Sequence, residues 1–223
     1  MTAEKIKKND FIEIEFTGSF DGRVFDTTKP EKAKEMGVDS KNIKPMIVSV
    51  GNEMLLKGLD EDLIEKEIGK PYEIHLLPEK AFGSRNPKMI RTYPLKSFRD
   101  NNINPYPGAV LQLDNMIAKV ISVSGGRVMI DFNNPMAGKE VDYSYKIIRK
   151  IDDDKEKINA LQDFFFKQRF EFDVNGGKII FKDEKIKPVI DIFSERFKDM
   201  TGLEFECKKE ERKKIKEEDT QKQ

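Results

Sequence analysis

Apolar and polar residues alternate along the first part of the chain. Within residues 10–17, Ile12, Ile14 and Phe16 occur at every second position, and acidic residues lie between them. This period of two predicts a strand with one buried face. Asp21-Gly22 then indicates a turn. Comparable apolar runs predict further strands at 23–26, 46–50, 72–76 and 141–147.

The spacing of the apolar residues becomes helical at Leu59. Leu59, Leu63, Ile64 and Ile68 recur at intervals that place them on one side of a helix, with acidic residues between them. Gly69 follows this run as a typical helix stop. We therefore expect one helix that begins at Leu59 and ends just before this glycine.

The alternation at 72–76 finds a matching pattern only after a long interval, at 141–147. Neighbouring strands that are so far apart in sequence predict a separate unit inserted between them. The interval has strand-like runs and one helical run of its own, at 89–92, 95–100, 109–113, 116–123 and 127–132. We therefore expect a small, mostly antiparallel domain inserted into the first one.

A third unit is predicted from Ile151 onward. The acidic run 152–154 precedes a helical apolar pattern and is interpreted as its cap, in preference to a metal site. A hairpin around Gly176-Gly177, a helix from about Pro188 and a strand at 203–207 follow. The expected domains are 1–84 with 133–150, an insertion at 85–132, a C-terminal domain at 151–207 and a charged tail at 208–223.

Composition narrows the possible functions. Charged and hydrophobic residues each make up 37% of the chain, which fits several small domains, and the 41 basic and 41 acidic residues balance. The neutral balance argues against a nucleic-acid or membrane-surface protein. No apolar run resembles a signal peptide or a membrane span, so we expect a cytoplasmic protein. With one histidine, His75, and one cysteine, Cys207, a zinc site built from their side chains is excluded, and carboxylates alone would have to bind any metal. No metal site and no cofactor are expected, and His75 is interpreted as a surface residue.

Five segments carry a recognisable pattern through their order and spacing. They are Phe16-Thr17-Gly18, residues 21–28 (DGRVFDTT), residues 50–60 (VGNEMLLKGLD), residues 78–83 (PEKAFG) and residues 134–139 (NPMAGK). Together they resemble FKBP-type peptidyl-prolyl cis-trans isomerases, in particular the long, SlyD-like prokaryotic forms with an insert-in-flap domain. The polar loop at 29–45 and the third unit are similar to archaeal long forms. The resemblance covers about residues 6–150.

The resemblance implies an α+β fold, in which a twisted antiparallel sheet wraps around one short helix. It also implies a substrate pocket between the sheet and the helix. The residues carried over as catalytic are Phe16, Phe25, Asp26, Leu56, Leu59, Phe82 and Tyr143, and those expected to bind substrate are Met46, Leu55, Met89 and Tyr93. Leu59 would form the floor of the pocket, and the backbone N–H of Leu56 would bind a substrate carbonyl. The insertion would supply chaperone activity.

The implied activity needs no nucleophile. Rotation about an X-Pro bond is slow because it breaks amide resonance, with a barrier of roughly 18–20 kcal/mol. An apolar pocket favours the less polar twisted amide over the planar one. Phe16 and Phe82 occupy positions at which the family usually has tyrosine, so we expect modest turnover and weak binding of macrolides of the FK506 type.

Several alternatives remain open at this stage. The chain could be a binding-only folding chaperone with a vestigial pocket, and an RNA-binding or ribosome-associated protein is the third class of function. The expected partners are proline-containing unfolded polypeptides, and a homodimer through 151–207 is an open alternative to a monomer. Met89, Tyr93 and other apolar residues of the insertion could form a client surface or simply the core of that domain.

Overall fold

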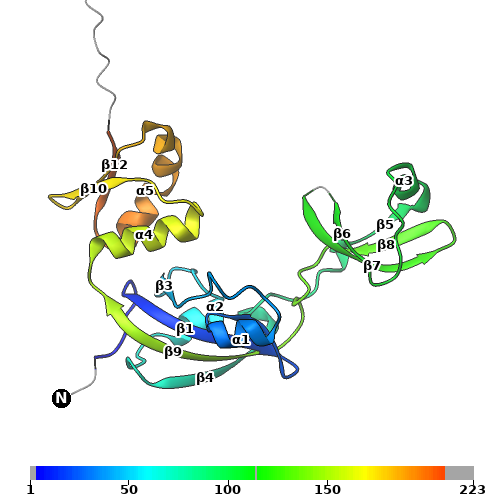
Figure 1. Cartoon of the computed structure of the whole chain (residues 1–223), viewed down its shortest axis with the longest axis horizontal. Coiled ribbons are helices and arrows are strands. Elements are labelled where there is room, and N and C mark those ends of the chain that lie inside the picture. Colours follow the sequence, from blue (N-terminus) through cyan, green and yellow to red (C-terminus); the bar gives the residue numbers. More distant parts are fainter. Residues whose placement is uncertain (1–3, 114, 209–223) are drawn as a thin grey trace, which may run out of the picture.

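The computed structural model describes residues 4–113 and 115–208. Its first unit is a five-stranded antiparallel sheet in which β1 (Phe11–Phe20) is the hub. β1 pairs with β2 (Arg23–Thr27), β3 (Met46–Ser49) and β9 (Val141–Ile151), and β9 also pairs with β4 (Pro71–Leu76). Figure 1 shows the long β1 and β9 running side by side. The expected pairing of the segments around 72–76 and 141–147 is therefore confirmed.

Two short helices accompany this sheet. α1 (Pro30–Glu35) lies in the loop between β2 and β3, and α2 (Lys57–Asp62) packs against the inner face of the sheet. The predicted helix from Leu59 to Ile68 is wrong in its extent. Glu65 has a positive φ of 66°, and its N–H donates to the Ile6 carbonyl, so the chain leaves the helix and turns back along the N-terminal segment.

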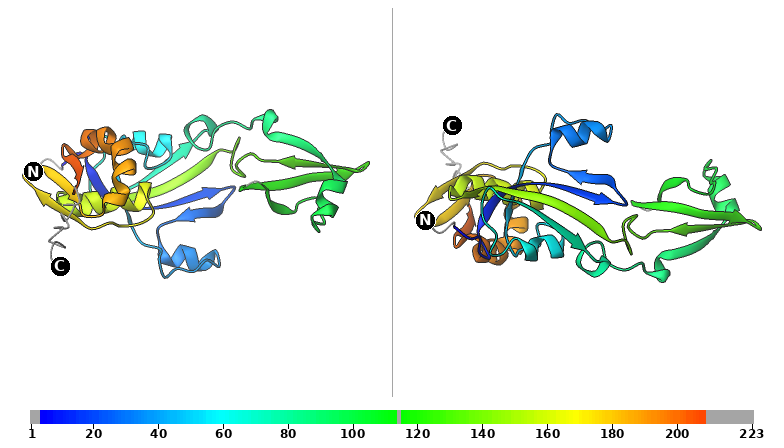
Figure 2. Two further views of the ribbon diagram at one scale, coloured as in Figure 1. Left: turned by 90° about the horizontal axis from the view of Figure 1, so that it is seen from above. Right: turned by 90° about the horizontal axis from the view of Figure 1, so that it is seen from below.

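The inserted unit forms its own sheet and its own core. The strands lie in the order β5 (Ile90–Pro94), β8 (Arg127–Asp131), β7 (Met116–Ser124) and β6 (Val110–Leu113), all antiparallel. A 3-10 helix, η2 (Pro87–Met89), precedes β5, and α3 (Leu95–Asp100) covers one face of the sheet. In Figures 1 and 2 this unit extends away from the rest of the chain.

The C-terminal unit combines two helices with three strands. The Asp153 carboxylate caps α4 (Asp154–Phe165) by accepting from the Glu156 N–H at 2.8 Å, so the acidic run is a helix cap. The remaining elements, in chain order, are β10 (Phe172–Asn175), β11 (Lys178–Phe181), η3 (Glu184–Ile186), α5 (Lys187–Thr201) and β12 (Glu204–Cys207).

The buried residues form two hydrophobic clusters. One belongs to the insertion alone. The other joins the first sheet to the C-terminal unit, because Ile158 and Leu161 of α4 and Phe197 of α5 pack into the same cluster as β1 and β9. An α+β fold is thus confirmed.

Two expectations concern parts of the chain about which less can be said. Of the predicted charged tail, residues 209–223 lie outside the described residues. Among the helices of the described ranges, none has the length and apolar character needed to cross a bilayer. The cytoplasmic location stays a prediction.

Candidate active site

Three strands of the first sheet bring Asp26, Gly18 and Tyr143 into one row. Gly18 of β1 is the register partner of Asp26 on β2 and of Tyr143 on β9. Partners across an antiparallel sheet direct their side chains to the same face. Asp26 and Tyr143 therefore flank a position that has no side chain.

A β-bulge adds Phe25 to this row. The register between β1 and β2 shifts at Gly18/Ser19, so that Val24 and Asp26 pair with consecutive residues and Phe25 between them has no partner. A bulge can redirect a side chain that regular alternation would send to the opposite face. The ring of Phe25 accordingly meets the ring of Tyr143 edge-on, with centroids 6.0 Å apart.

Four aromatic rings gather at this face of the sheet. The ring centroid of Tyr143 lies 5.8 Å from that of Phe16, and Phe25 meets Phe82 edge-on at 5.7 Å. Phe16 and Tyr143 are buried, whereas Phe25 and Phe82 are half-buried. We refer to these four residues as the aromatic cluster.

Gly18 is the residue that lets the ring of Tyr143 lie flat across the sheet. A Cβ atom at this position would lie 2.7 Å from Cζ and 2.9 Å from Cε1 of Tyr143. Carbon atoms in contact prefer separations of about 3.5–4.0 Å. Any side chain at Gly18 would therefore displace the ring.

The helix α2 packs into the same core as the aromatic cluster. Leu59 of α2 is fully buried in the same core, and Leu56 is the N-cap residue, whose carbonyl accepts from the Asp60 N–H at 2.9 Å. A Cβ at Gly58 would lie 3.0 Å from Cβ of Lys80 in η1 (Pro78–Lys80). This glycine allows α2 to pack closely against the turn that leads to Phe82.

The loop before α2 is held by a buried carboxylate. Asp60 accepts from the Gly51 and Glu53 backbone N–H groups, both at 2.8 Å. Glu53 has a positive φ of 60°, so these bonds stabilise an unusual backbone conformation. Burial raises the pKa of Asp60, and the backbone hydrogen bonds oppose this shift. Asp60 thereby fixes the loop that carries Leu55 and Leu56.

Two threonines tie the end of β2 to Phe16. The Thr28 Oγ1 accepts from the Phe16 N–H at 2.8 Å, and the Thr27 hydroxyl donates to the Phe16 carbonyl at 3.1 Å. Both threonines are buried. Their bonds fix the backbone of Asp26, the residue before them, relative to the aromatic cluster.

The two titratable groups of the site both have raised pKa values. Burial raises the pKa of the Tyr143 hydroxyl well above its usual value, and the nearby charge of Asp26 adds to the effect. Partial loss of hydration raises the pKa of the Asp26 carboxyl, although the residue as a whole is exposed and the Thr27 backbone hydrogen bond opposes the shift. Tyr143 is therefore protonated at neutral pH and can donate a hydrogen bond.

Comparisons with known proteins identify relatives of this chain. A family model described as FKBP-type peptidyl-prolyl cis-trans isomerase matches residues 2–94, and one described as the FKBP26 IF domain matches residues 91–136. The short-type peptidyl-prolyl cis-trans isomerase of Methanocaldococcus jannaschii is 33% identical over 144 residues, covering 64% of this chain and 92% of that protein. This chain belongs to the FKBP-type peptidyl-prolyl cis-trans isomerase family. The enzyme class expected from the sequence is thus confirmed.

Two bacterial relatives are similar over comparable stretches. The FKBP-type 16 kDa peptidyl-prolyl cis-trans isomerase of Escherichia coli is 25% identical over 151 residues, covering 66% of this chain and 94% of that protein. The SlyD isomerase of Haemophilus influenzae is 23% identical over 128 residues, covering 52% and 62%. Neither family model extends beyond residue 136.

The structure brings five of the expected FKBP site residues to one place, namely the rings of Phe16, Phe25, Phe82 and Tyr143 with Asp26 beside them. Phe16, Leu59 and Tyr143 are buried in one core, and Phe25, Met46, Leu55, Leu56 and Phe82 pack against it. Met89 and Tyr93 lie elsewhere, against the core of the insertion, where the ring of Tyr93 contacts Phe98 and Phe132. Their role in substrate binding stays a prediction.

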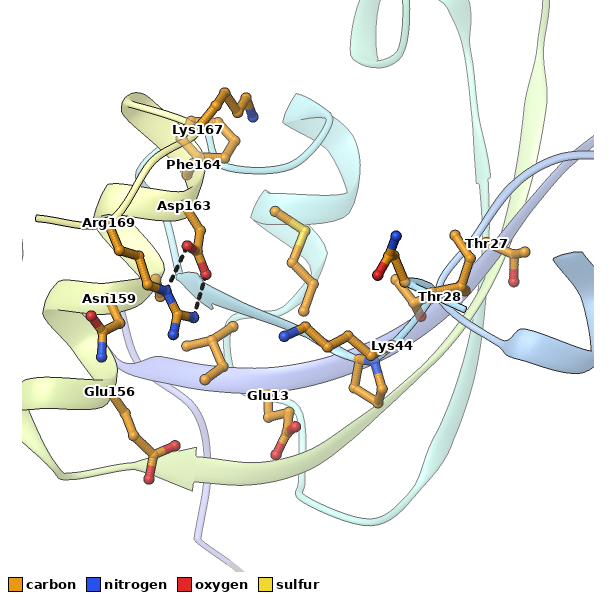
Figure 3. Close-up of a pocket in the computed structure, with 16 residues that line it drawn as sticks. Glu13, Thr27, Thr28, Lys44, Glu156, Asn159, Asp163, Phe164, Lys167 and Arg169 are labelled. Carbon is orange, nitrogen blue, oxygen red and sulfur yellow. Dashed lines mark hydrogen bonds and ion pairs between the residues drawn. The ribbon is translucent and has the colours of Figure 1, made fainter. Parts of the chain in front are cut away.

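Met46 also lines a cavity of about 460 Å³ between β3 and α4 (Figure 3). Its wall is polar on the side of α4, where Arg169 donates two hydrogen bonds to Asp163, at 2.8 and 2.6 Å. Thr27 and Thr28 line it from the other side. The lining residues come from β3, the end of β2 and α4, so this cavity lies between the FKBP sheet and the C-terminal unit.

His75 lies on the exposed side of the sheet, as expected from the sequence. Its Nδ1 is 2.7 Å from Asp142 Oδ1 and its Nε2 is 2.9 Å from Glu140 Oε2. Hydrogen bonds to these two carboxylates, that of Asp142 first, raise the pKa of His75. The histidine forms ion pairs on the surface and has no contact with the aromatic cluster among the described hydrogen bonds and ring pairs.

Sequence reasoning did not assign the roles of Gly18, Gly58, Asp60 and the bulge at Phe25. All four belong to the motif segments on which the family resemblance rests. The signal was thus present, but its cause is a close approach of two side chains, a backbone hydrogen bond or an irregular strand pairing. Such contacts leave no periodic pattern.

Proposed function

We propose that the aromatic cluster is the site at which this FKBP-type isomerase twists X-Pro bonds, and that the inserted domain holds the client chain. The observation that carries the first part is the row formed by Asp26, Gly18 and Tyr143, flanked by three phenylalanines. The geometry supports a binding site with apolar walls and two polar groups at its side.

This arrangement suits the chemistry of prolyl isomerisation. The planar amide is the more charge-separated form, so apolar rings disfavour it relative to the twisted one, which lowers the barrier. The Tyr143 hydroxyl supplies the donor that Phe16 and Phe82 lack at their positions. An acceleration of 10³ to 10⁵ requires only about 4–7 kcal/mol of differential stabilisation.

The first test is cis-trans exchange in an Ala-Leu-Pro-Phe peptide, followed by NMR with catalytic amounts of the protein. We expect clear acceleration by the wild type and a reduction of about tenfold or more in Asp26→Ala, since a group in contact with the reacting amide is lost. Asp142→Ala is the matched control, because Asp142 precedes Tyr143 on β9 and is exposed on the other face. No acceleration by the wild type would leave the binding-only chaperone as the function.

The second part of the proposal rests on an open face of the inserted sheet. One face packs against Phe98 through Ala118, Val120, Val128 and Ile130. The large apolar side chains that remain exposed on this domain are Tyr106, Val110, Met116, Ile117, Ile121 and Met129. Val110, Ile117 and Met129 alternate with buried residues of their strands and belong to the open face, whereas Met116 is on the face of Ala118. An exposed apolar surface that includes a flexible methionine suits the binding of many different unfolded segments.

Val110 and Ile117 are the most exposed of these residues, at 67% and 69%. They belong to neighbouring strands, since Ile117 pairs with Gln112 on β6. We expect Val110→Ser/Ile117→Ser to weaken protection of an unfolded client against aggregation, with unchanged activity on the short peptide. Ile192→Ser is the control, because Ile192 is 75% exposed on α5 in the C-terminal unit. Equal loss of protection in both variants would contradict the assignment of client binding to the insertion.

Binding of FK506-type macrolides and dimerisation through residues 151–207 stay predictions. Titration with the macrolide and sedimentation equilibrium test them directly.

A further inference from the structure

The inserted domain is joined to the FKBP domain by two irregular segments, 81–86 and 132–140. The two domains have separate hydrophobic clusters, so no shared core among the described residues fixes their relative orientation. Whatever holds the insertion in place must therefore lie in the connecting segments.

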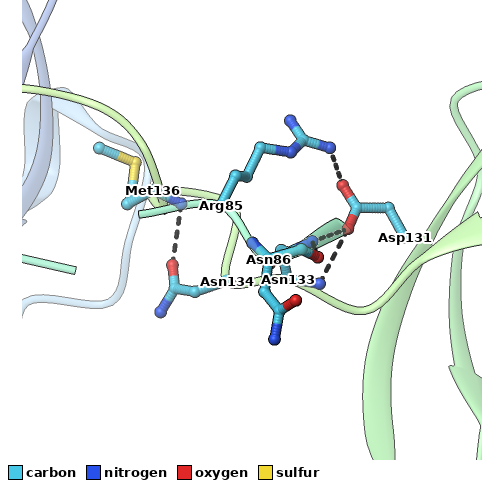
Figure 4. A network of polar contacts seen from close by, with 6 residues as sticks. All are labelled: Arg85, Asn86, Asp131, Asn133, Asn134 and Met136. Carbon is cyan, nitrogen blue, oxygen red and sulfur yellow. Dashed lines mark hydrogen bonds and ion pairs between the residues drawn. The ribbon is translucent and has the colours of Figure 1, made fainter. Parts of the chain in front are cut away.

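A side chain–backbone pair links these two segments (Figure 4). The Asn86 N–H donates to Asn133 Oδ1 at 2.8 Å, and Asn133 Nδ2 donates to the Asn86 carbonyl at 3.1 Å. The side-chain amide of Asn133 thus pairs with the main chain of Asn86 as a neighbouring strand would. It connects the entering and the leaving segment at a point where neither is in a sheet.

Asp131 holds Asn133 in the position that this pair requires. Its Oδ1 accepts from the Asn133 N–H at 2.9 Å and from Asn133 Nδ2 at 2.7 Å. Its Oδ2 accepts from Arg85 on the other connecting segment. Asp131 is only 8% exposed although it lies at the end of β8. Because this carboxylate is buried, breaking its hydrogen bonds to the two segments would cost free energy.

Two backbone bonds flank this network. The Phe132 N–H donates to the Met89 carbonyl at 3.0 Å, and the Gly138 N–H donates to the Gly83 carbonyl at 2.8 Å. Gly83 follows Phe82 of the aromatic cluster directly. The connection therefore begins at the edge of the proposed isomerase site.

We propose that Asp131, Asn133, Asn86 and Arg85 form a clasp that fixes the direction of the inserted domain relative to the aromatic cluster. Asp131 and Asn133 are then positioning residues for the reaction on protein clients, and they contact neither client nor proline. This inference rests on the proposed function, since it concerns how a client held on the insertion reaches the isomerase site.

The physical reason is the effective concentration of the client. A client segment bound to one domain has an effective concentration at a site on another domain. This concentration rises with the fraction of time that the two domains are oriented so that the segment can enter the site. A fixed direction keeps this fraction high, whereas free rotation about two short linkers lowers it. A short peptide that binds only at the aromatic cluster does not depend on that direction.

The test compares Asn133→Ala with Asn134→Ala in the full-length protein. Asn134 is the matched control, because its Oδ1 accepts only from the nearby Met136 N–H and does not cross between the segments. Arg85→Gln is a second variant of the clasp; its side chain is exposed, so the fold should tolerate the change. The readouts are ¹⁵N relaxation of the inserted domain, exchange of Ala-Leu-Pro-Phe and proline-limited refolding of a reduced, unfolded ribonuclease variant.

For Asn133→Ala we expect the inserted domain to tumble with a shorter correlation time than the FKBP domain. We also expect kcat/KM for the protein client to fall about five- to tenfold, since each neutral hydrogen bond lost corresponds to roughly a factor of five. Arg85→Gln should change both readouts in the same direction. Activity on the peptide should stay within about twofold of the wild type in every variant.

A single correlation time for both domains in Asn133→Ala would overturn the clasp. So would equal effects of Asn133→Ala and Asn134→Ala on refolding of the client. If the wild type does not accelerate exchange of the peptide, the proposed isomerase site is refuted. The relaxation data would still decide whether the clasp exists.

Discussion

Substitution of Gly18 by alanine tests the geometry of the aromatic cluster most directly. The added Cβ would lie 2.7 Å from Cζ of Tyr143, so the ring must recede by about 0.8 Å to reach an ordinary carbon contact of about 3.5 Å. The rings of Phe16 and Phe25 flank it with centroids at 5.8 and 6.0 Å and leave little room for that movement.

Two opposing terms decide the size of the effect. Overpacking of this kind costs about 1–3 kcal/mol, whereas replacing glycine by alanine within a strand gains about 0.5–1 kcal/mol from backbone entropy. Overpacking wins, and we expect Gly18→Ala to lower the free energy of unfolding by about 1–2 kcal/mol. Because the Tyr143 hydroxyl moves with its ring, isomerisation of the short peptide should fall about tenfold.

Urea unfolding and NMR exchange of Ala-Leu-Pro-Phe measure the two quantities separately. In a Tyr143→Ala background the clash is absent, so Gly18→Ala should become neutral or slightly stabilising there. The reasoning is refuted if Gly18→Ala costs the same free energy in both backgrounds, or if the single variant is as stable and active as the wild type.

Two further predictions concern the other polar groups of the sheet. Tyr145 donates to Asp62 Oδ2 at 2.5 Å, so Tyr145→Phe should lower the free energy of unfolding by about 1.5–3 kcal/mol and leave peptide activity unchanged. Tyr143→Phe should lower peptide activity and leave the free energy of unfolding unchanged. Urea unfolding and peptide exchange measure both quantities. His75 is the only histidine, and its NMR titration should give a pKa above the usual 6.5, which Asp142→Asn should bring down. Because the folded-state pKa is raised, this ion pair stabilises the fold fully below the unfolded-state pKa of His75, and the contribution disappears as the pH rises through the folded-state value. An unshifted titration, or one that Asp142→Asn leaves unchanged, would contradict the surface pairing.

The strands of the FKBP sheet could be predicted from sequence because their alternation is local. The extent of α2 could not, since Leu63 and Ile64 continue the helical spacing past its end. What ends the helix is the pairing of residues 65 and 66 with Ile6, a contact between distant parts of the chain. Local periodicity contains no information on such a long-range contact.

The candidate site shows the same division. The family motifs indicated which residues gather, including Phe25 and Asp26. The bulge that turns Phe25 toward Tyr143 comes from the irregular pairing of β1 with β2. The empty space at Gly18 receives the ring of a residue on β9, which is far from β1 in sequence. The motif contains the residues that these contacts require, but it does not show the contacts themselves.

The described residues form three sheets but only two hydrophobic clusters, and this affects how the molecule unfolds. The first sheet and the C-terminal unit share an interior, so their amide hydrogens should exchange with solvent through one cooperative opening. The insertion, with an interior of its own, should open independently. It is thus the part of this protein that evolution or an engineer could remove or replace as a cassette, whereas the C-terminal unit could not be removed without exposing the interior of the isomerase domain.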